Sequence, residues 1–206
     1  MGPTKIMIIR HAEKPGTYDE NEYKGINAFG ENDKESLITL GWERAGGIAN
    51  VFDPTTHPKL ATPDFIYASN PAIHHDMEPS QRPYQTISAL AGKLNVQPNT
   101  SFPKSHYRNM VTAVLALHVA QNTCTVLIAW QHEDILPKES SSDSIVSELL
   151  KQTKTGNLPG VPTGPWPEDR YDMVFVFDRP NGNGPLTGFT QVPQLLLAGD
   201  SMVPIP

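Results

Sequence analysis

Short apolar runs alternate with longer amphipathic stretches along this chain. The apolar runs predict buried β-strands over residues 5–10, 64–69, 125–130 and 172–177. The amphipathic stretches predict helices over residues 40–52, 81–94, 107–121 and 143–153. Because strands and helices alternate, the pattern predicts an α/β fold, a three-layer α/β/α sandwich with a mainly parallel sheet.

The length of the chain suits one domain. Its 206 residues provide enough material for a buried core, so we expect a single domain over residues 1–206. Segments without periodicity predict long loops at 16–36, 70–80 and 154–170. The 20 prolines are about twice the usual share, which favours ordered loops over disorder.

Chemically active side chains follow the predicted strands. Arg10-His11-Ala12-Glu13 comes directly after the first strand, and Gln131-His132-Glu133 comes after the third. Ser69 closes the second strand, and Arg82 opens the helix that follows it. Ligands in open α/β sheets bind outside the carboxyl ends of the strands, so we expect these groups to converge on one site.

These segments resemble the motifs of the histidine phosphatase superfamily, whose fold phosphoglycerate mutases and acid phosphatases share. Arg10-His11-Ala12-Glu13 is similar to its RHG(E) signature, with Ala12 in the glycine position. Ser69 and the later Arg82-x-x-Gln85-Thr86 resemble its S…RxxQTA element, although the gap is long and Ile87 replaces the alanine. His132 resembles the second family histidine, and Thr39–Ala45 resembles the start of its LTxxGxxQA helix. The matches lie in family order between residues 6 and 133.

The resemblance implies a metal-independent phosphoric monoester hydrolase that needs no cofactor. His11 would attack phosphorus as a neutral imidazole and form a phosphohistidine. Arg10 and Arg82 would bind the phosphoryl group through planar guanidinium forks, which match phosphate oxygens. His132 would donate to the equatorial oxygens, where charge gathers in the transition state.

The leaving group needs a proton, and the sequence restricts its source. No Asp or Glu occurs from Pro79 through His132, where the mutase-like branch of the family places its acid. The acid phosphatase branch places an acid directly after the second histidine, and in this chain that residue is Glu133. We therefore expect Glu133 to be the proton donor, with Asp134 as the fallback and with Asp76 and Glu78 as further alternatives.

Two other functions compete with this interpretation. Ala12 in place of glycine, together with the long gap between Ser69 and Arg82, is compatible with a weakly active or inactive regulatory protein that binds phosphate. Alternatively, His74-His75-Asp76 with His57, His132 and Glu133 could hold a divalent metal in a metallohydrolase, although no HxH or HExxH motif is present.

Charge and cysteine usage limit the partners and the setting. The net charge of −6 without a Lys/Arg cluster argues against nucleic acid or an anionic membrane, so we expect a small phosphorylated substrate. Cys124 is the single cysteine, so no intrachain disulfide can form. No signal-peptide or transmembrane run is visible, which favours a cytoplasmic setting. The sequence does not define an oligomeric state.

Overall fold

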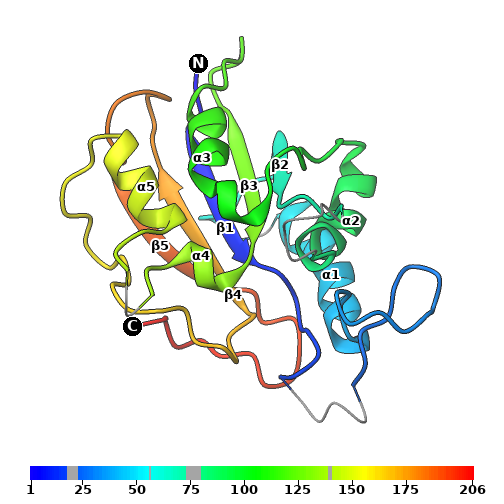
Figure 1. Ribbon diagram of the computed structural model, residues 1–206. Coiled ribbons are helices and arrows are strands. Elements are labelled where there is room, and N and C mark those ends of the chain that lie inside the picture. The colour runs from blue at the N-terminus through cyan, green and yellow to red at the C-terminus, as the bar shows by residue number, and fades with distance from the viewer. Residues whose placement is uncertain (18–22, 56, 73–79, 139–140) are drawn as a thin grey trace.

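A five-stranded sheet forms the centre of the computed structural model, which describes residues 1–17, 23–55, 57–72, 80–138 and 141–206 (Figure 1). The strand order across the sheet is β2-β3-β1-β4-β5. The strands are β1 (Lys5–Arg10), β2 (Phe65–Ala68), β3 (Thr125–Trp130), β4 (Met173–Asp178) and β5 (Gly188–Pro193). β3 is buried throughout and β1 is buried except at Lys5, and both lie inside this order, which explains the apolar runs at their centres.

The sheet is mixed, so the prediction of a mainly parallel sheet is wrong. β3 pairs in parallel with both β1 and β2, whereas β4 runs antiparallel to β1 and to β5. The chain reaches β4 through a long segment without helix or strand, from residue 153 to residue 172. Such a segment can return to either end of the sheet, so the apolar pattern of β4 does not determine its direction.

Helices pack on both faces of the sheet. They are α1 (Thr39–Phe52), α2 (Arg82–Leu94), α3 (Tyr107–Leu115), α4 (His132–Ile135) and α5 (Ile145–Gln152), with a short 3₁₀ helix η1 (Lys104–His106) before α3. Met7 and Ile9 of β1 belong to the hydrophobic cluster that includes α1 and α2. Ile6 and Ile8 belong to the cluster that includes α3 and α5. Alternate side chains of a strand point to opposite faces, so each helix pair covers one face.

Most predicted elements are present, and three differences have physical reasons. The third helix ends at Leu115 rather than at residue 121, because Leu117 and Val119 pack against the core from an irregular segment. β5 was not predicted, since only Val192 of its side chains is buried and its alternation is weak. The four-residue α4 is too short to leave a periodic pattern.

The strand directions bring four chain segments to one edge of the sheet. β1, β2 and β3 end there, and their ends carry His11, Ser69 and Gln131. Antiparallel β4 begins at the same edge, because its Val174 pairs with Ile9, so Tyr171 lies beside His11.

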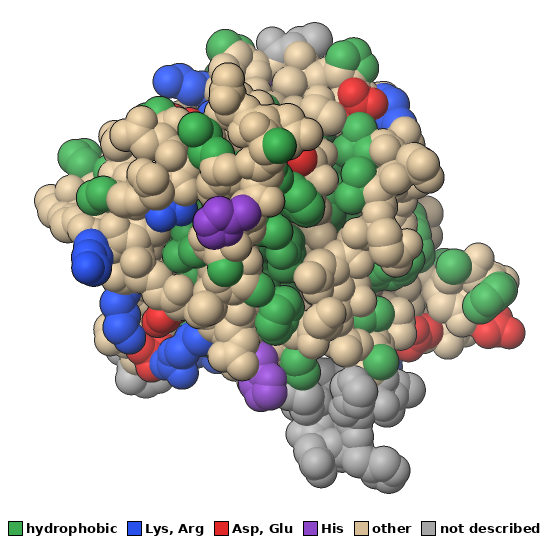
Figure 2. All heavy atoms as spheres, turned by 90° about the horizontal axis from the view of Figure 1, so that it is seen from above, with side chains coloured by type: hydrophobic (Ala, Val, Ile, Leu, Met, Phe, Trp, Pro, Cys, Tyr) green, Lys and Arg blue, Asp and Glu red, His purple; other side chains and the backbone are tan. Residues whose placement is uncertain are grey.

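Figure 2 shows the opposite end of the molecule, where most visible Lys and Arg side chains lie toward the periphery. None of the helices in the described ranges is long and apolar enough to cross a membrane.

Candidate active site

His11 is held in one orientation at the end of β1. Its backbone N–H donates to the Trp130 carbonyl of β3, and the residue as a whole is only 1% exposed. Nδ1 lies 2.7 Å from the Ala12 carbonyl oxygen, which can only accept, so Nδ1 carries the proton and Nε2 has a free lone pair. Burial lowers the pKa of His11 well below its usual value, and the charges of Arg10, Arg82 and His132 lower it further. His11 is therefore neutral at physiological pH.

Arg10 is fully buried beside His11. Its Nη1 donates to three backbone carbonyl oxygens, those of Pro167, Glu168 and Arg170, at 3.0, 2.6 and 3.1 Å. Its guanidinium carbon lies 3.8 Å from the centre of the Tyr171 ring. Nε and Nη2 are buried and have no hydrogen-bond partner among the described residues. One edge of the guanidinium is thus fixed, and the other has two donors available for an anion.

His132 and Glu133 interact at the start of α4. The rings of His132 and His11 are 6.5 Å apart, edge to face. Nδ1 of His132 lies 3.0 Å from Oε2 of Glu133, and burial lowers the pKa of His132 although this contact opposes the shift. Burial acts to raise the pKa of Glu133, but the contact with His132 outweighs it and holds that pKa below its usual range. Glu133 is therefore a carboxylate in the free site.

A pocket of about 460 Å³ opens beside these groups. It is lined by His11, Lys14, Lys34, Glu35, Ser80, Arg82, Lys104, Gln131 and Glu133. Of the predicted site residues, His11, Arg82 and Glu133 line this pocket, whereas Arg10 and His132 lie next to His11 without lining it. Nη2 of Arg82 donates to the Lys34 carbonyl at 2.7 Å and lies 3.4 Å from Oε2 of Glu35, while its Nε is buried and unpartnered among the described residues.

The remaining motif residues support the site without lining it. Thr86 accepts a hydrogen bond from the Ala12 N–H at 2.8 Å and donates to the Arg82 carbonyl, so it connects the nucleophile loop to α2. Gln85 accepts from the Leu37 N–H and fixes the approach to α1. Ser69 accepts from Nε2 of Gln131 at 2.9 Å and joins the ends of β2 and β3.

Ala12 occupies its position without strain. Its φ is not among the positive values found in the described backbone, so glycine is not required there. Its buried methyl group belongs to a small cluster with Leu37 and Ala45. The replacement of glycine therefore does not by itself argue for an inactive site.

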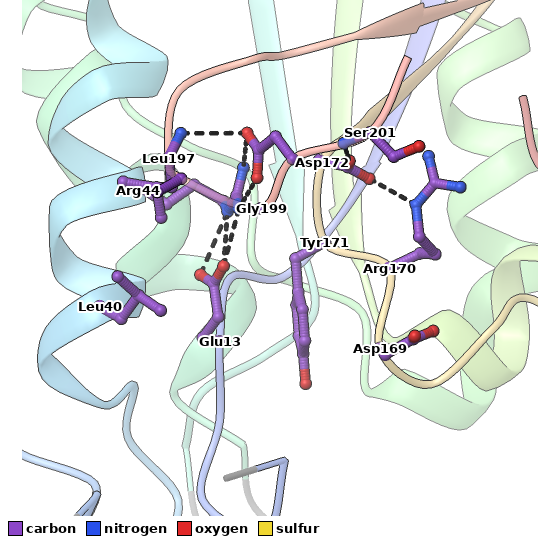
Figure 3. Close-up of a pocket in the computed structure, with 12 residues that line it drawn as sticks. Glu13, Leu40, Arg44, Asp169, Arg170, Tyr171, Asp172, Leu197, Gly199 and Ser201 are labelled. Atoms are coloured by element: carbon purple, nitrogen blue, oxygen red, sulfur yellow. Dashed lines mark hydrogen bonds and ion pairs between the residues drawn. The ribbon is translucent and has the colours of Figure 1, made fainter. Parts of the chain in front are cut away.

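Glu13 turns away from the pocket and into a buried ion-pair network. Arg44 of α1 donates to both carboxylate oxygens of Glu13 and to Asp200 (Figure 3). Its Nη1 also donates to Gln194. Glu13, Arg44 and Asp200 line a second cavity of about 350 Å³. The network holds the residue two positions after His11 between α1 and the segment at 194–200.

Several pocket residues were not predicted from the sequence. Lys34, Glu35, Ser80 and Lys104 lie on irregular segments or beside element ends, where no periodicity or motif marks them. Tyr171 and the carbonyl groups around Arg10 reach the site only because β4 is antiparallel. The predicted loops at 16–36, 70–80 and 154–170 were the available signal, since the first contains Lys34 and Glu35 and the second contains Ser80.

Of the alternative proton donors and candidate metal ligands, the structure describes only some. Asp134 does not line the pocket, and burial together with the charge of Glu133 raises its pKa to about 6. His74, His75, Asp76 and Glu78 lie outside the described residues. Within the described ranges, no group of three or more His, Cys, Asp or Glu side chains is arranged to hold a metal ion.

Comparisons with known proteins give a distant structural likeness. No protein-family model and no curated protein matches the sequence. A candidate phosphohistidine phosphatase SixA from Agrobacterium tumefaciens aligns with a TM-score of 0.45 and 17% identity, covering 91% of this chain and 98% of its own. One from Nakamurella multipartitia aligns with a TM-score of 0.46 and 11% identity, covering 94% and 98%. At these values the likeness is too distant to assign an activity.

Proposed function

We propose that this protein is a histidine phosphatase, which hydrolyses a small phosphomonoester through a phosphohistidine on His11. The observation that carries the proposal is the state of His11, a buried and neutral imidazole whose free Nε2 is available in a pocket of cations. A neutral nitrogen nucleophile is needed because it must approach a phosphoryl group that carries up to two negative charges.

In the first step, Nε2 of His11 attacks phosphorus in line with the bond to the leaving oxygen. The N–P bond forms as the P–O bond breaks, and that bond's electron pair goes to the leaving oxygen. The unpartnered donors of Arg10 and Arg82 bind the phosphoryl oxygens, and His132 donates where charge gathers in the transition state. The Ala12 carbonyl, which accepts from Nδ1, stabilises the positive charge that develops on the His11 ring.

Glu133 transfers the proton in this scheme. It is ionised in the free site, so it takes its proton from a monoanionic substrate, because the second pKa of a phosphate group is about 6. The bound anion raises the pKa of the adjacent carboxyl group, and Glu133 then passes the proton to the leaving oxygen.

In the second step, water replaces the leaving group. Glu133, again a carboxylate, accepts a proton from the water as its oxygen attacks phosphorus, and the N–P bond breaks. His11 returns to its neutral form, and inorganic phosphate leaves the pocket. The side chains named above supply the positive charge for both steps.

Hydrolysis of p-nitrophenyl phosphate between pH 4.5 and 7.5, with EDTA present, tests the proposal. We expect the wild type to be active, because nitrophenolate is a stable anion that leaves without a proton. His11→Ala is expected to reduce the rate at least about 10³-fold, because it removes the nucleophile. Activity that persists in His11→Ala, or that EDTA abolishes in the wild type, contradicts the proposal.

A phosphate-binding protein without turnover is the second candidate, and the contacts of Arg82 favour it. This side chain already donates to the Lys34 carbonyl and lies near Glu35, so an incoming phosphate must compete for it. The hydrolysis assay together with a binding measurement separates the two functions. Calorimetric binding of inorganic phosphate by a wild type that hydrolyses no phosphomonoester supports the second candidate.

A further inference from the structure

The hydrogen bonds of Arg10 hold one end of its guanidinium group and leave the tilt of the group open. All three bonds, to the carbonyl oxygens of residues 167, 168 and 170, meet at Nη1. Nε and Nη2 are buried and have no hydrogen-bond partner among the described residues. Because the guanidinium is planar, a tilt about Nη1 would change the direction of both available donors. A further contact is therefore needed to hold that direction.

The ring of Tyr171 supplies this contact. Its centre lies 3.8 Å from the guanidinium carbon of Arg10, so the cation packs closely over the ring. The negative face of an aromatic ring attracts a cation, and the attraction is strongest where both groups are shielded from water. Arg10 is fully buried and Tyr171 is only 2% exposed. The ring therefore restrains the tilt of the guanidinium.

Tyr171 is itself fixed in place. Its hydroxyl group is hydrogen-bonded to the hydroxyl group of Thr17, and its backbone carbonyl accepts from Nε2 of Gln194 at 3.3 Å. β4 begins two residues later and pairs with β1, whose last residue is Arg10. The ring and the guanidinium thus extend from paired strands of one sheet, so their relative position is set by the sheet.

Tyr171 affects the pocket through Arg10. Its side chain does not line the pocket beside His11, and it points away from the ion pairs of Arg44 (Figure 3). Burial raises the pKa of Tyr171, so its ring is uncharged at physiological pH. No carboxylate among the described residues accepts a hydrogen bond from Arg10, whose three acceptors are all backbone carbonyl groups. Arg10 is thus restrained without an anionic partner.

We propose that Tyr171 is a positioning residue, whose ring face holds Arg10 in the orientation in which Nε and Nη2 bind a phosphoryl group. The inference rests on the proposed function for the role of Arg10 in binding phosphate. An aromatic ring suits this task because it restrains the guanidinium without occupying its donors or cancelling its charge. A carboxylate would do both and would compete with the ligand.

Binding of inorganic phosphate, measured by calorimetry, tests this role without turnover. Tyr171→Leu is expected to weaken phosphate binding about fivefold or more, because the guanidinium loses its restraint. Tyr171→Phe keeps the ring and is expected to retain the affinity to within about twofold. Tyr107→Leu is the matched control, because Tyr107 is also buried, its ring centre lies 5.4 Å from the guanidinium carbon of Arg108, and neither residue lines the pocket. This control is expected to retain the affinity.

A double-mutant cycle separates positioning from a general effect on the fold. Arg10→Met alone is expected to weaken phosphate binding, and in that background Tyr171→Leu should have no further effect. A second change of the ring keeps the test decisive if thermal unfolding shows that Tyr171→Leu does not fold. Placing 3,4,5-trifluorophenylalanine at position 171 retains the ring but weakens its negative face, and it is expected to bind phosphate about twofold or more weakly than Tyr171→Phe.

The inference is overturned if phosphate affinity is unchanged in Tyr171→Leu or in the fluorinated variant, or if the loss in Tyr171→Leu is equally large with Arg10→Met. Hydrolysis of p-nitrophenyl phosphate by the wild type is measured separately. If hydrolysis is absent while phosphate binding depends on the ring, the proposed catalysis fails and the positioning role stands. If hydrolysis requires His11 while phosphate binding is independent of the ring, the reverse holds.

Discussion

Glu133 and Asp134 are adjacent carboxyl groups whose pKa values are shifted in opposite directions. Burial and the charge of Glu133 raise the pKa of Asp134 to about 6. The contact with His132 lowers the pKa of Glu133 below its usual range. Only Glu133 lines the pocket. Geometry therefore favours Glu133 for proton transfer, and the pKa values require that its proton come from the substrate.

Replacing Glu133 by Gln tests this role through the leaving group. We expect kcat/KM for an alkyl phosphate to fall about 10²–10³-fold, because the alkoxide needs a proton as it leaves. For p-nitrophenyl phosphate the expected loss is much smaller, since that leaving group is a stable anion. Equal losses for both substrates contradict the assignment of Glu133.

Asp134 makes a separate prediction about stability and pH. Its folded pKa of about 6 lies above the ordinary aspartate value of 3.8, so the ionised form is less favourable in the folded protein than in the unfolded chain. The contribution of Asp134 to stability is thus greatest below pH 4 and is lost as the pH rises through 6. Asp134→Asn should therefore stabilise the protein at pH 7.5 by about 1–2 kcal/mol, allowing for partial exposure, relative to its effect at pH 4.

Urea unfolding of wild type and Asp134→Asn at both pH values measures this difference. A stability change that is the same at pH 4 and pH 7.5 would show that the Asp134 carboxyl group is not perturbed in the folded state.

Sequence reasoning identified the side chains with distinctive chemistry, and it missed those that only the tertiary structure brings to the pocket. His11, Arg82 and Glu133 line the pocket as expected, although no result yet tests their roles. Lys34 and Lys104 were not identified, because an isolated lysine on an irregular segment has the same sequence signature as any solvated lysine.

At the scale of elements, the start of α1 supports the nucleophile loop through a close backbone approach. A Cβ atom added at Gly41 would lie 2.5 Å from the Glu13 carbonyl oxygen and 3.0 Å from its nitrogen. The Ile38 N–H also donates to that carbonyl at 3.2 Å. Gly41 therefore allows α1 to contact the loop that carries His11.

Two glycine substitutions in this helix should have opposite effects. Gly41→Ala is expected to destabilise the protein by about 1–3 kcal/mol and to reduce kcat, because the methyl group displaces the Glu13 backbone. Gly46→Ala is the control in the same helix, since no atom lies within 4 Å of its added Cβ, and it should stabilise by about 0.5–1 kcal/mol. Chemical denaturation and a rate assay on both variants check the prediction. Equal effects would mean that the contact with Glu13 is unimportant.

The sequence pattern predicts the positions of the strands but not the direction of each strand in the sheet. The apolar runs placed β1, β3 and β4 to within a residue. They did not give the direction of β4, because a buried strand has the same composition in parallel and antiparallel pairing. That direction brings Tyr171 and the carbonyl groups of the 167–170 segment to Arg10.

At the scale of the whole molecule, the net charge is negative although the residues that line the pocket carry an excess of positive charge. The chain carries −6 overall, yet the described pocket is lined by four Lys or Arg residues and two Glu residues. A phosphate site needs only local positive charge, and an acidic exterior is compatible with it. Composition therefore argues against large anionic partners and is compatible with a small anionic substrate.

The most direct test of the central claim is to identify the phosphorylated residue. Wild-type protein is mixed with ³²P-labelled p-nitrophenyl phosphate and quenched in alkali, and the labelled peptide is sequenced by mass spectrometry. The account predicts label on His11 that appears and decays at rates matching turnover, and no label in His11→Ala. Turnover without a phosphorylated protein, or label on another residue such as His132, would contradict it.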